Sequence, residues 1–220
     1  MSLIIKICGL STPDTLDAAL QAGADMVGFV RFEKSPRHVS LDALKGLADQ
    51  VGSIAAKVLL TVDADDGALE AAVAALKPDA LQLHGRETPE RVRALQKRFR
   101  MPVIKAIGVG ASAQDIATAK AFEGVADLIL FDAAPGRDGA DLPGGTGKAF
   151  DWSVLQALDI ETPWLLAGGL TPDNVAEAVK TTAAAGVDVS SGVESAPGVK
   201  DPGKIAAFVA KARAAAKLGA

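Results

Sequence analysis

One alternation runs through the whole sequence: a short apolar run rich in β-branched residues, a polar break, and then an alanine-rich amphipathic stretch. Most of the apolar runs are continuous rather than alternating, which is typical of parallel strands covered on both faces. The pattern predicts eight strands, at Leu3–Cys8, Met26–Phe32, Ala55–Val62, Ala80–His84, Val103–Ile107, Leu128–Asp132, Trp164–Ala167 and Val187–Ser190.

The stretches between these runs predict helices, at Thr12–Gln21, Leu41–Gln50, Asp65–Leu76, Pro89–Phe99, Ala113–Ala121, Trp152–Ala157, Pro172–Lys180 and Pro202–Lys217. Four of the predicted helices begin with a capping residue followed by a proline, which favours the first helical position. The four pairs are Thr12-Pro13, Thr88-Pro89, Thr171-Pro172 and Asp201-Pro202. Glycines are typical of helix ends, and we expect Gly23, Gly52 and Gly186 to act there.

Eight βα units in 220 residues predict a (βα)8 TIM barrel, formed as a single domain over residues 1–220. An open, doubly wound sheet is the alternative, but no Gly-x-Gly-x-x-Gly follows the first strand. Functional residues of a TIM barrel lie at the carboxyl ends of the strands and in the loops that follow. This rule selects Lys6, Cys8, Arg37, His38, Asp63, Gln82, His84, Lys105, Asp132, Gly168, Gly169 and the residues from Asp188 to Gly192.

Composition excludes several classes of protein. The formal net charge is −4, so no basic stripe is available for nucleic acid, and no run of 18 apolar residues predicts a membrane span. The single cysteine, Cys8, excludes an intramolecular disulfide and a multi-cysteine metal site, and two histidines leave little for a histidine-rich one. We expect a cytoplasmic protein without a metal, a nucleic-acid partner or a membrane partner.

Two predicted loops carry an anion-binding pattern. Gly168-Gly169 follows the seventh strand and Ser190-Ser191-Gly192 follows the eighth. Glycine lets a ligand approach the backbone closely, and these two loops form the usual phosphate site of a TIM barrel. The alternative is that the glycines only serve turns with positive φ. Both loops together favour phosphate binding.

The segment 133–148, after the sixth strand, is the longest predicted loop. Its glycines favour a flap that covers a ligand, because loops of this length are usually functional or disordered. The run Gly144–Lys148 is superficially similar to a phosphate-binding P-loop. The required Ser or Thr is missing, however, because Ala149 follows Lys148.

Cys8 and Asp132 end two strands that would meet at one mouth of the barrel. A thiolate can act as a general base and a carboxylic acid as a general acid. An ordinary thiol is only about 3% ionised at neutral pH, so base function needs a nearby positive charge, from Lys6 or Arg37. The alternatives are a buried hydrophobic cysteine and an aspartate that caps a turn.

Other polar residues of this mouth have open roles. Arg37 is expected to bind an anion or a carboxylate. His84 either meets the ligand or only donates a hydrogen bond to a neighbouring loop, and His38 either lines the mouth or is solvated.

Over essentially its whole length, the chain resembles the phosphoribosylanthranilate isomerase family of tryptophan biosynthesis. Each motif is weak alone, but their number, order and placement at strand ends are specific. The motifs are Lys6-Ile7-Cys8-Gly9, Gly28-Phe29, Ser35-Pro36-Arg37, Gln82-Leu83-His84-Gly85, Phe131-Asp132, Gly144-Gly145-Thr146-Gly147, Phe150-Asp151-Trp152, Leu166-Ala167-Gly168-Gly169-Leu170, Asn174, Val187 to Glu194, and Gly198-Val199-Lys200-Asp201.

The resemblance implies an Amadori rearrangement without cofactor or metal, in which an N-phosphoribosyl anthranilate becomes the corresponding aminoketose. It implies Asp132 as the general acid that opens the furanose ring, and Cys8 as the general base that removes the C2′ proton. Arg37 would contact the anthranilate carboxylate, and Asp188 would lie near the anthranilate nitrogen. His84 and Lys6 would lie in or beside the site. The implied phosphate cradle is Gly168, Gly169, Ser190, Ser191 and Gly192.

Three alternatives come with this resemblance. The histidine-pathway isomerase performs the same rearrangement in the same fold, but it would have an aspartate at position 8. Indole-glycerol-phosphate synthase would need a lysine–glutamate pair; Lys105 is present, but the early glutamate pattern is missing. A catalytically silent phosphate-binding barrel is opposed by the intact Cys8 and Asp132. The expected partner is the small-molecule substrate, bound by a monomer or a homodimer.

Overall fold

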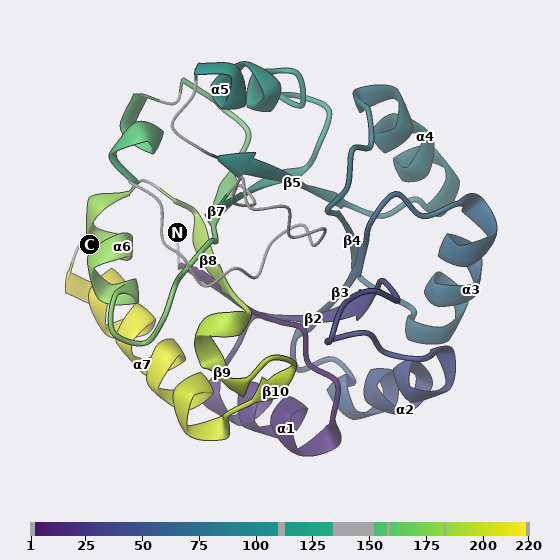
Figure 1. Cartoon of the computed structure of the whole chain (residues 1–220), viewed down its shortest axis with the longest axis horizontal. Helices are drawn as coiled ribbons and strands as arrows, with labels where there is room; N and C mark the ends of the chain where they lie inside the picture. Colours follow the sequence, from purple (N-terminus) through teal and green to yellow (C-terminus); the bar gives the residue numbers. More distant parts are fainter. Residues whose placement is uncertain (1–2, 110–112, 134–151, 158, 183, 219–220) are drawn as a thin grey trace.

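Eight parallel strands close into a barrel in chain order, and the helices surround it as an outer ring (Figure 1). The computed structural model describes residues 3–109, 113–133, 152–157, 159–182 and 184–218. The strands are β1 (Ile4–Cys8), β2 (Met26–Arg31), β3 (Ala56–Thr61), β4 (Ala80–Leu83), β5 (Val103–Val109), β6 (Leu128–Ala133), β7 (Trp164–Leu166) and β8 (Gly186–Val189). The predicted TIM barrel is therefore confirmed, and all eight predicted strands form with small shifts at their ends.

The strands separate two apolar layers. Val58, Ile104 and Leu130 belong to a cluster that contains no helix residue and fills the inside of the barrel. Their chain neighbours Leu59, Val103 and Ile129 pack together with helix residues on the outside. Successive side chains of a strand point to opposite faces, so alternate residues face the barrel interior and those between them face the helices.

The helices follow the strands with the capping chemistry that the sequence predicts. Thr12 and Thr88 accept hydrogen bonds from the N–H groups of Thr15 and Arg91, and Asp201 accepts one from Lys204. Gly23 ends the first helix at φ 86°. The elements are α1 (Pro13–Ala22), α2 (Leu41–Val51), α3 (Asp66–Leu76), α4 (Pro89–Phe99), α5 (Ala113–Lys120), α6 (Val175–Thr181), α7 (Pro202–Leu218) and the 3₁₀ helices η1 (Trp152–Ala157) and η2 (Ser191–Val193).

Two local expectations are wrong. Helix α6 begins at Val175 rather than at Pro172, because the Asn174 side chain turns back and holds Thr171 N–H (2.8 Å) and the carbonyl of Gly169 (2.9 Å). Gly186 opens β8 instead of ending a helix; a Cβ there would meet the carbonyl oxygen of Ile4 on the paired strand β1. The helix predicted at Trp152–Ala157 forms with these bounds, as the 3₁₀ helix η1.

The sequence did not predict a small antiparallel hairpin after β8. It consists of β9 (Glu194–Ala196) and β10 (Val199–Lys200), and it lies between α1 and α7 in Figure 1. Of the described helices, none combines the length and the apolar character needed to cross a membrane.

Candidate active site

A hollow lies at the carboxyl end of the barrel, where the predicted phosphate loops meet. The seventh and eighth loops contribute Gly168, Gly169, Ser190, Ser191 and Gly192 to its wall. Two carboxylates, Asp132 and Asp188, line the same hollow. All five predicted phosphate residues are therefore brought together beside the predicted general acid.

Close backbone contacts require the glycines of this hollow. A Cβ on Gly192 would meet the carbonyl oxygen of Leu170, and a Cβ on Gly168 would meet the backbone nitrogen of Ala133. Gly168 and Gly169 also have φ values of 81° and 70°, which L side chains rarely adopt. The first N–H groups of η2 have no partner within that helix, so they can donate to an anion.

Cys8 lies beside a buried ion pair inside the barrel. Lys6 Nζ donates to Asp188 Oδ1 at 2.9 Å, and the Lys6 side chain is 0% exposed. Gly28 leaves room for this group, since a Cβ there would lie 2.8 Å from Cys8 Sγ and 3.2 Å from Lys6 Nζ. Burial raises the pKa of the Cys8 thiol, and Asp188 adds to this, while the Lys6 ammonium opposes both. Lys6 is thus the positive charge that lowers the thiol pKa most, and Lys200 adds a smaller effect of the same sign.

Asp132 is held from two sides at the end of β6. Its Oδ1 accepts the N–H of Ala133 at 2.8 Å, and its Oδ2 lies 3.3 Å from Nε2 of His84. His84 Nδ1 is in turn 3.0 Å from the amide nitrogen of the buried Gln82. His84 therefore contacts the predicted general acid through one ring nitrogen and Gln82 through the other.

Arg37 forms a two-pronged ion pair that the sequence did not predict. Its Nε and Nη2 donate to the two carboxylate oxygens of Glu194 at 2.7 and 2.8 Å. Lys200 approaches the same carboxylate at 2.6 Å. Burial opposes ionisation of Glu194, but the hydrogen bond from Arg37 and the charge of Lys200 outweigh it and lower the pKa of the carboxyl group.

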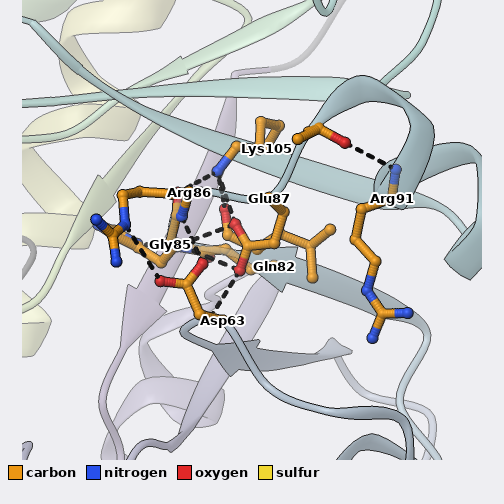
Figure 2. Close-up of polar contacts among 10 residues, drawn as sticks. Asp63, Gln82, Gly85, Arg86, Glu87, Arg91 and Lys105 are labelled. Carbon is orange, nitrogen blue, oxygen red and sulfur yellow. Dashed lines mark hydrogen bonds and ion pairs between the residues drawn. The ribbon is translucent and has the colours of Figure 1, made fainter.

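Lys105 and Asp63 lie outside the site. Lys105 occupies an outward-facing position of β5. Its ammonium forms an ion pair with Glu87 at 2.8 Å and donates to the carbonyl of Gly85 at 2.7 Å. Figure 2 shows this cluster, in which Asp63 binds the N–H of Arg86 at 2.6 Å. These residues anchor the turn that follows His84 rather than lining the hollow.

His38 and the predicted flap are the two remaining expectations of the sequence analysis. His38 contacts Arg31 through Nε2 at 2.7 Å. The predicted flap, residues 133–148, lies outside the described residues apart from Ala133. Glu194 and Lys200 are the polar residues of the site whose role the sequence analysis missed. They belong to the quoted motifs, but nothing in their spacing relates them to Arg37.

Comparisons with known proteins show which family the chain is similar to. The family model of N-(5′-phosphoribosyl)anthranilate isomerase matches residues 5–211. The N-(5′-phosphoribosyl)anthranilate isomerase of Beijerinckia indica is 60% identical over 213 residues, which cover 97% of this chain and 95% of that protein. The Rhodopseudomonas palustris (strain BisB5) protein of the same name is 59% identical over 99% of both chains.

Solved structures show the same likeness. The phosphoribosyl anthranilate isomerase from Thermotoga maritima has a TM-score of 0.86 and 33% identity, over 96% of this chain and 99% of that one. A phosphoribosyl anthranilate isomerase in complex with reduced 1-(o-carboxyphenylamino)-1-deoxyribulose 5-phosphate has a TM-score of 0.84 and 30% identity, with the same coverage. The chain belongs to the N-(5′-phosphoribosyl)anthranilate isomerase family of tryptophan biosynthesis.

Proposed function

We propose that the chain converts N-(5′-phosphoribosyl)anthranilate into 1-(2-carboxyphenylamino)-1-deoxyribulose 5-phosphate, with Asp132 as the general acid and Cys8 as the general base. One observation carries the assignment of roles. Asp188 lines the hollow together with Asp132, and it also binds Lys6, the charge partner of Cys8. The acid, the base and the phosphate loops therefore belong to one connected site.

The reaction needs two proton transfers to the substrate and two from it. Asp132 gives its proton to the ring oxygen, the C1′–O bond breaks, and the anthranilate nitrogen becomes an iminium. Cys8 then removes the C2′ proton, and the electron pair neutralises the iminium to give an enolamine. The thiol can return a proton to C1′ while the Asp132 carboxylate takes the proton of the C2′ hydroxyl. The ketone forms and both groups are restored.

The iminium provides part of the activation of Cys8. Burial keeps the thiol pKa above its ordinary value in the free protein, although Lys6 opposes this rise. An iminium adjacent to C2′ adds a second positive charge, which favours the thiolate when the base is needed. The same cation accepts the electrons released at C2′, so the chemistry needs no separate electron sink.

The two anionic ends of the substrate are assigned to different residues. Arg37 is proposed to bind the anthranilate carboxylate. The glycine–serine hollow is proposed to bind the phosphate, and Asp188 to lie near the nitrogen that bridges the two halves of the substrate. His84 is proposed to orient Asp132 through their 3.3 Å contact. Lys6 is fully buried, so we assign it to Cys8 and Asp188 rather than to the substrate.

The decisive experiment follows anthranilate fluorescence after addition of freshly prepared phosphoribosyl anthranilate, with the wild type and Cys8→Ala in parallel. Loss of fluorescence with the wild type and a rate at least about 100-fold lower with the variant is expected for a general base. Equal rates would support the proposed reaction but would show that a residue other than Cys8 is the base. No loss beyond spontaneous decay would contradict the proposed function.

A cytoplasmic location, the absence of a cofactor and the choice between monomer and homodimer stay predictions. Sedimentation of the purified chain measures its oligomeric state directly. Protein concentration needs to be varied, because a weak dimer dissociates on dilution.

A further inference from the structure

The hairpin after β8 surrounds Arg37 with charged groups that the proposed reaction does not use. Glu194 from β9 binds Nε and Nη2 of Arg37, and Lys200 from β10 binds Oε1 of Glu194 at 2.6 Å. The Glu194 and Lys200 side chains are 4% and 1% exposed. A buried, two-pronged pair of this kind fixes the plane of a guanidinium group.

The backbone around Arg37 is fitted to the same hairpin. Gly198, in the turn between β9 and β10, has φ 81°, and a Cβ there would lie 2.6 Å from the carbonyl oxygen of Pro36. A Cβ on Gly9 would lie 2.6 Å from Cδ of Arg37. The arginine stem is therefore confined between the end of β1 and the hairpin.

The ion pair with Glu194 leaves part of the guanidinium available. Arginine has five N–H donors, and Glu194 takes one from Nε and one from Nη2. No described residue accepts a hydrogen bond from Nη1 of Arg37. The edge that includes Nη1 can therefore receive a second carboxylate.

Lys200 connects this arginine to the phosphate hollow. Its ammonium donates to the carbonyl oxygen of Ser190 at 2.9 Å and contacts Oγ of Ser190 at 3.1 Å. Ser190 is one of the residues that line the hollow. The three charged groups, Arg37, Glu194 and Lys200, together keep one net positive charge, so the cluster still attracts an anion.

We propose that Glu194 and Lys200 are positioning residues that adapt the site to a substrate with two anionic ends. Glu194 orients Arg37 toward the aromatic carboxylate, and Lys200 ties that arginine to the Ser190 turn of the phosphate hollow. The inference rests on the proposed function, because it assumes that Arg37 receives the carboxylate. It makes the hairpin a determinant of selectivity for carboxylated aryl groups.

The opposite role is also chemically possible. Glu194 could compete with the substrate carboxylate for Arg37, in which case its removal would tighten binding. Positioning and competition therefore differ in the sign of one measurement, the affinity for a carboxylated ligand after Glu194 loses its charge.

The test compares two ligands that differ by one carboxyl group. They are the reduced product 1-(2-carboxyphenylamino)-1-deoxyribitol 5-phosphate and its phenylamino counterpart, and calorimetry measures both dissociation constants. Glu194→Gln is expected to weaken the carboxylated ligand by about tenfold or more and the other by less than about twofold. Glu194→Asp keeps the charge but shortens the reach, so it should show the same selective loss.

Two controls separate positioning from general damage. Asp25→Asn removes a comparable carboxylate, which binds Arg213 and the N–H of Ile5 at the other end of the barrel, and it should change neither affinity. In an Arg37→Met background, Glu194→Gln should cause no further loss, because the group that it positions is gone. Lys200→Met should weaken both ligands, since Lys200 contacts Glu194 and Ser190.

The outcomes are distinguishable. Equal weakening of both ligands by Glu194→Gln, unchanged binding of both, or tighter binding of the carboxylated ligand would each overturn the positioning role. In steady-state kinetics, Glu194→Gln should raise KM by a larger factor than it lowers kcat. If the wild type bound both ligands without turning over phosphoribosyl anthranilate, the proposed reaction would fail while the selectivity measurement still stood.

Discussion

At the scale of single residues, the site depends on which charge stands next to which reacting group. Lys6 lies between Cys8 and Asp188, so it lowers the pKa of the thiol and neutralises the carboxylate at once. Removing one partner of such a buried pair costs about 3–5 kcal/mol, because the other charge stays buried without compensation. Lys6 is therefore important for stability as well as for the proposed base.

We expect Lys6→Met to raise the pKa of Cys8, because the ammonium group that lowers it most is lost, and only the weaker effect of Lys200 then opposes Asp188. Thiolate absorbance near 240 nm, followed against pH, measures this directly in a chain with one cysteine and no tyrosine. Lys57→Met is the matched control, since Lys57 pairs with Asp79 at 3.2 Å in another part of the barrel. A thiol titration unchanged by Lys6→Met would contradict the role of Lys6.

The pH dependence of turnover follows from the same contacts. Since burial raises the Cys8 pKa, the thiolate fraction of the free protein still increases above neutral pH, and kcat/KM should rise there. A flat profile between pH 6 and about 9 would argue against a thiolate base.

At the scale of elements, the phosphate hollow exists because two loops touch through their backbones. The first turn of η2 approaches the end of the seventh loop so closely that position 192 has no room for a side chain. Asn174 fixes the conformation of that loop, because its side chain accepts the N–H of Thr171 and donates to the carbonyl of Gly169.

Gly192→Ala should push η2 away from the seventh loop and weaken binding of the phosphate end. We expect about 1–3 kcal/mol of lost stability from the added methyl group and a clear rise in the dissociation constant for inorganic phosphate. Gly46→Ala in α2 is the control: its Cβ meets nothing within 4 Å, so stability should stay equal or increase by up to about 1 kcal/mol. Equal phosphate affinity in wild type and Gly192→Ala would contradict the assignment of the hollow.

At the scale of the whole molecule, barrel closure joins residues that are far apart in the chain. Arg37 and Glu194 are separated by 157 positions, and Lys6 and Asp188 by 182. Both pairs form only when β8 pairs with β1. We therefore predict that the chain unfolds as a single domain in one cooperative transition, so circular dichroism and tryptophan fluorescence should give the same midpoint.

The acid dependence of stability is a second property of the closed barrel. The folded pKa of Glu194 lies below its usual value, so its ionisation stabilises the fold above the unfolded pKa of about 4.3. That contribution is lost as the pH falls through the folded pKa. Denaturant unfolding of wild type and Glu194→Gln should therefore differ most near neutral pH, and the difference should shrink as the pH falls through the folded pKa of Glu194.

The sequence by itself determined the barrel, because eight apolar runs alternate with capped amphipathic stretches, and it placed Cys8, Asp132 and the phosphate glycines at strand ends. It could not distinguish Lys6 from Lys105. Strands covered on both faces are apolar on both, so their pattern carries no sign of which side chains point inward. Strand register and closure decided that Lys6 meets Cys8 inside the barrel and that Lys105 meets Glu87 outside. The same closure brought the β9–β10 hairpin to Arg37, a contact that no local pattern encodes.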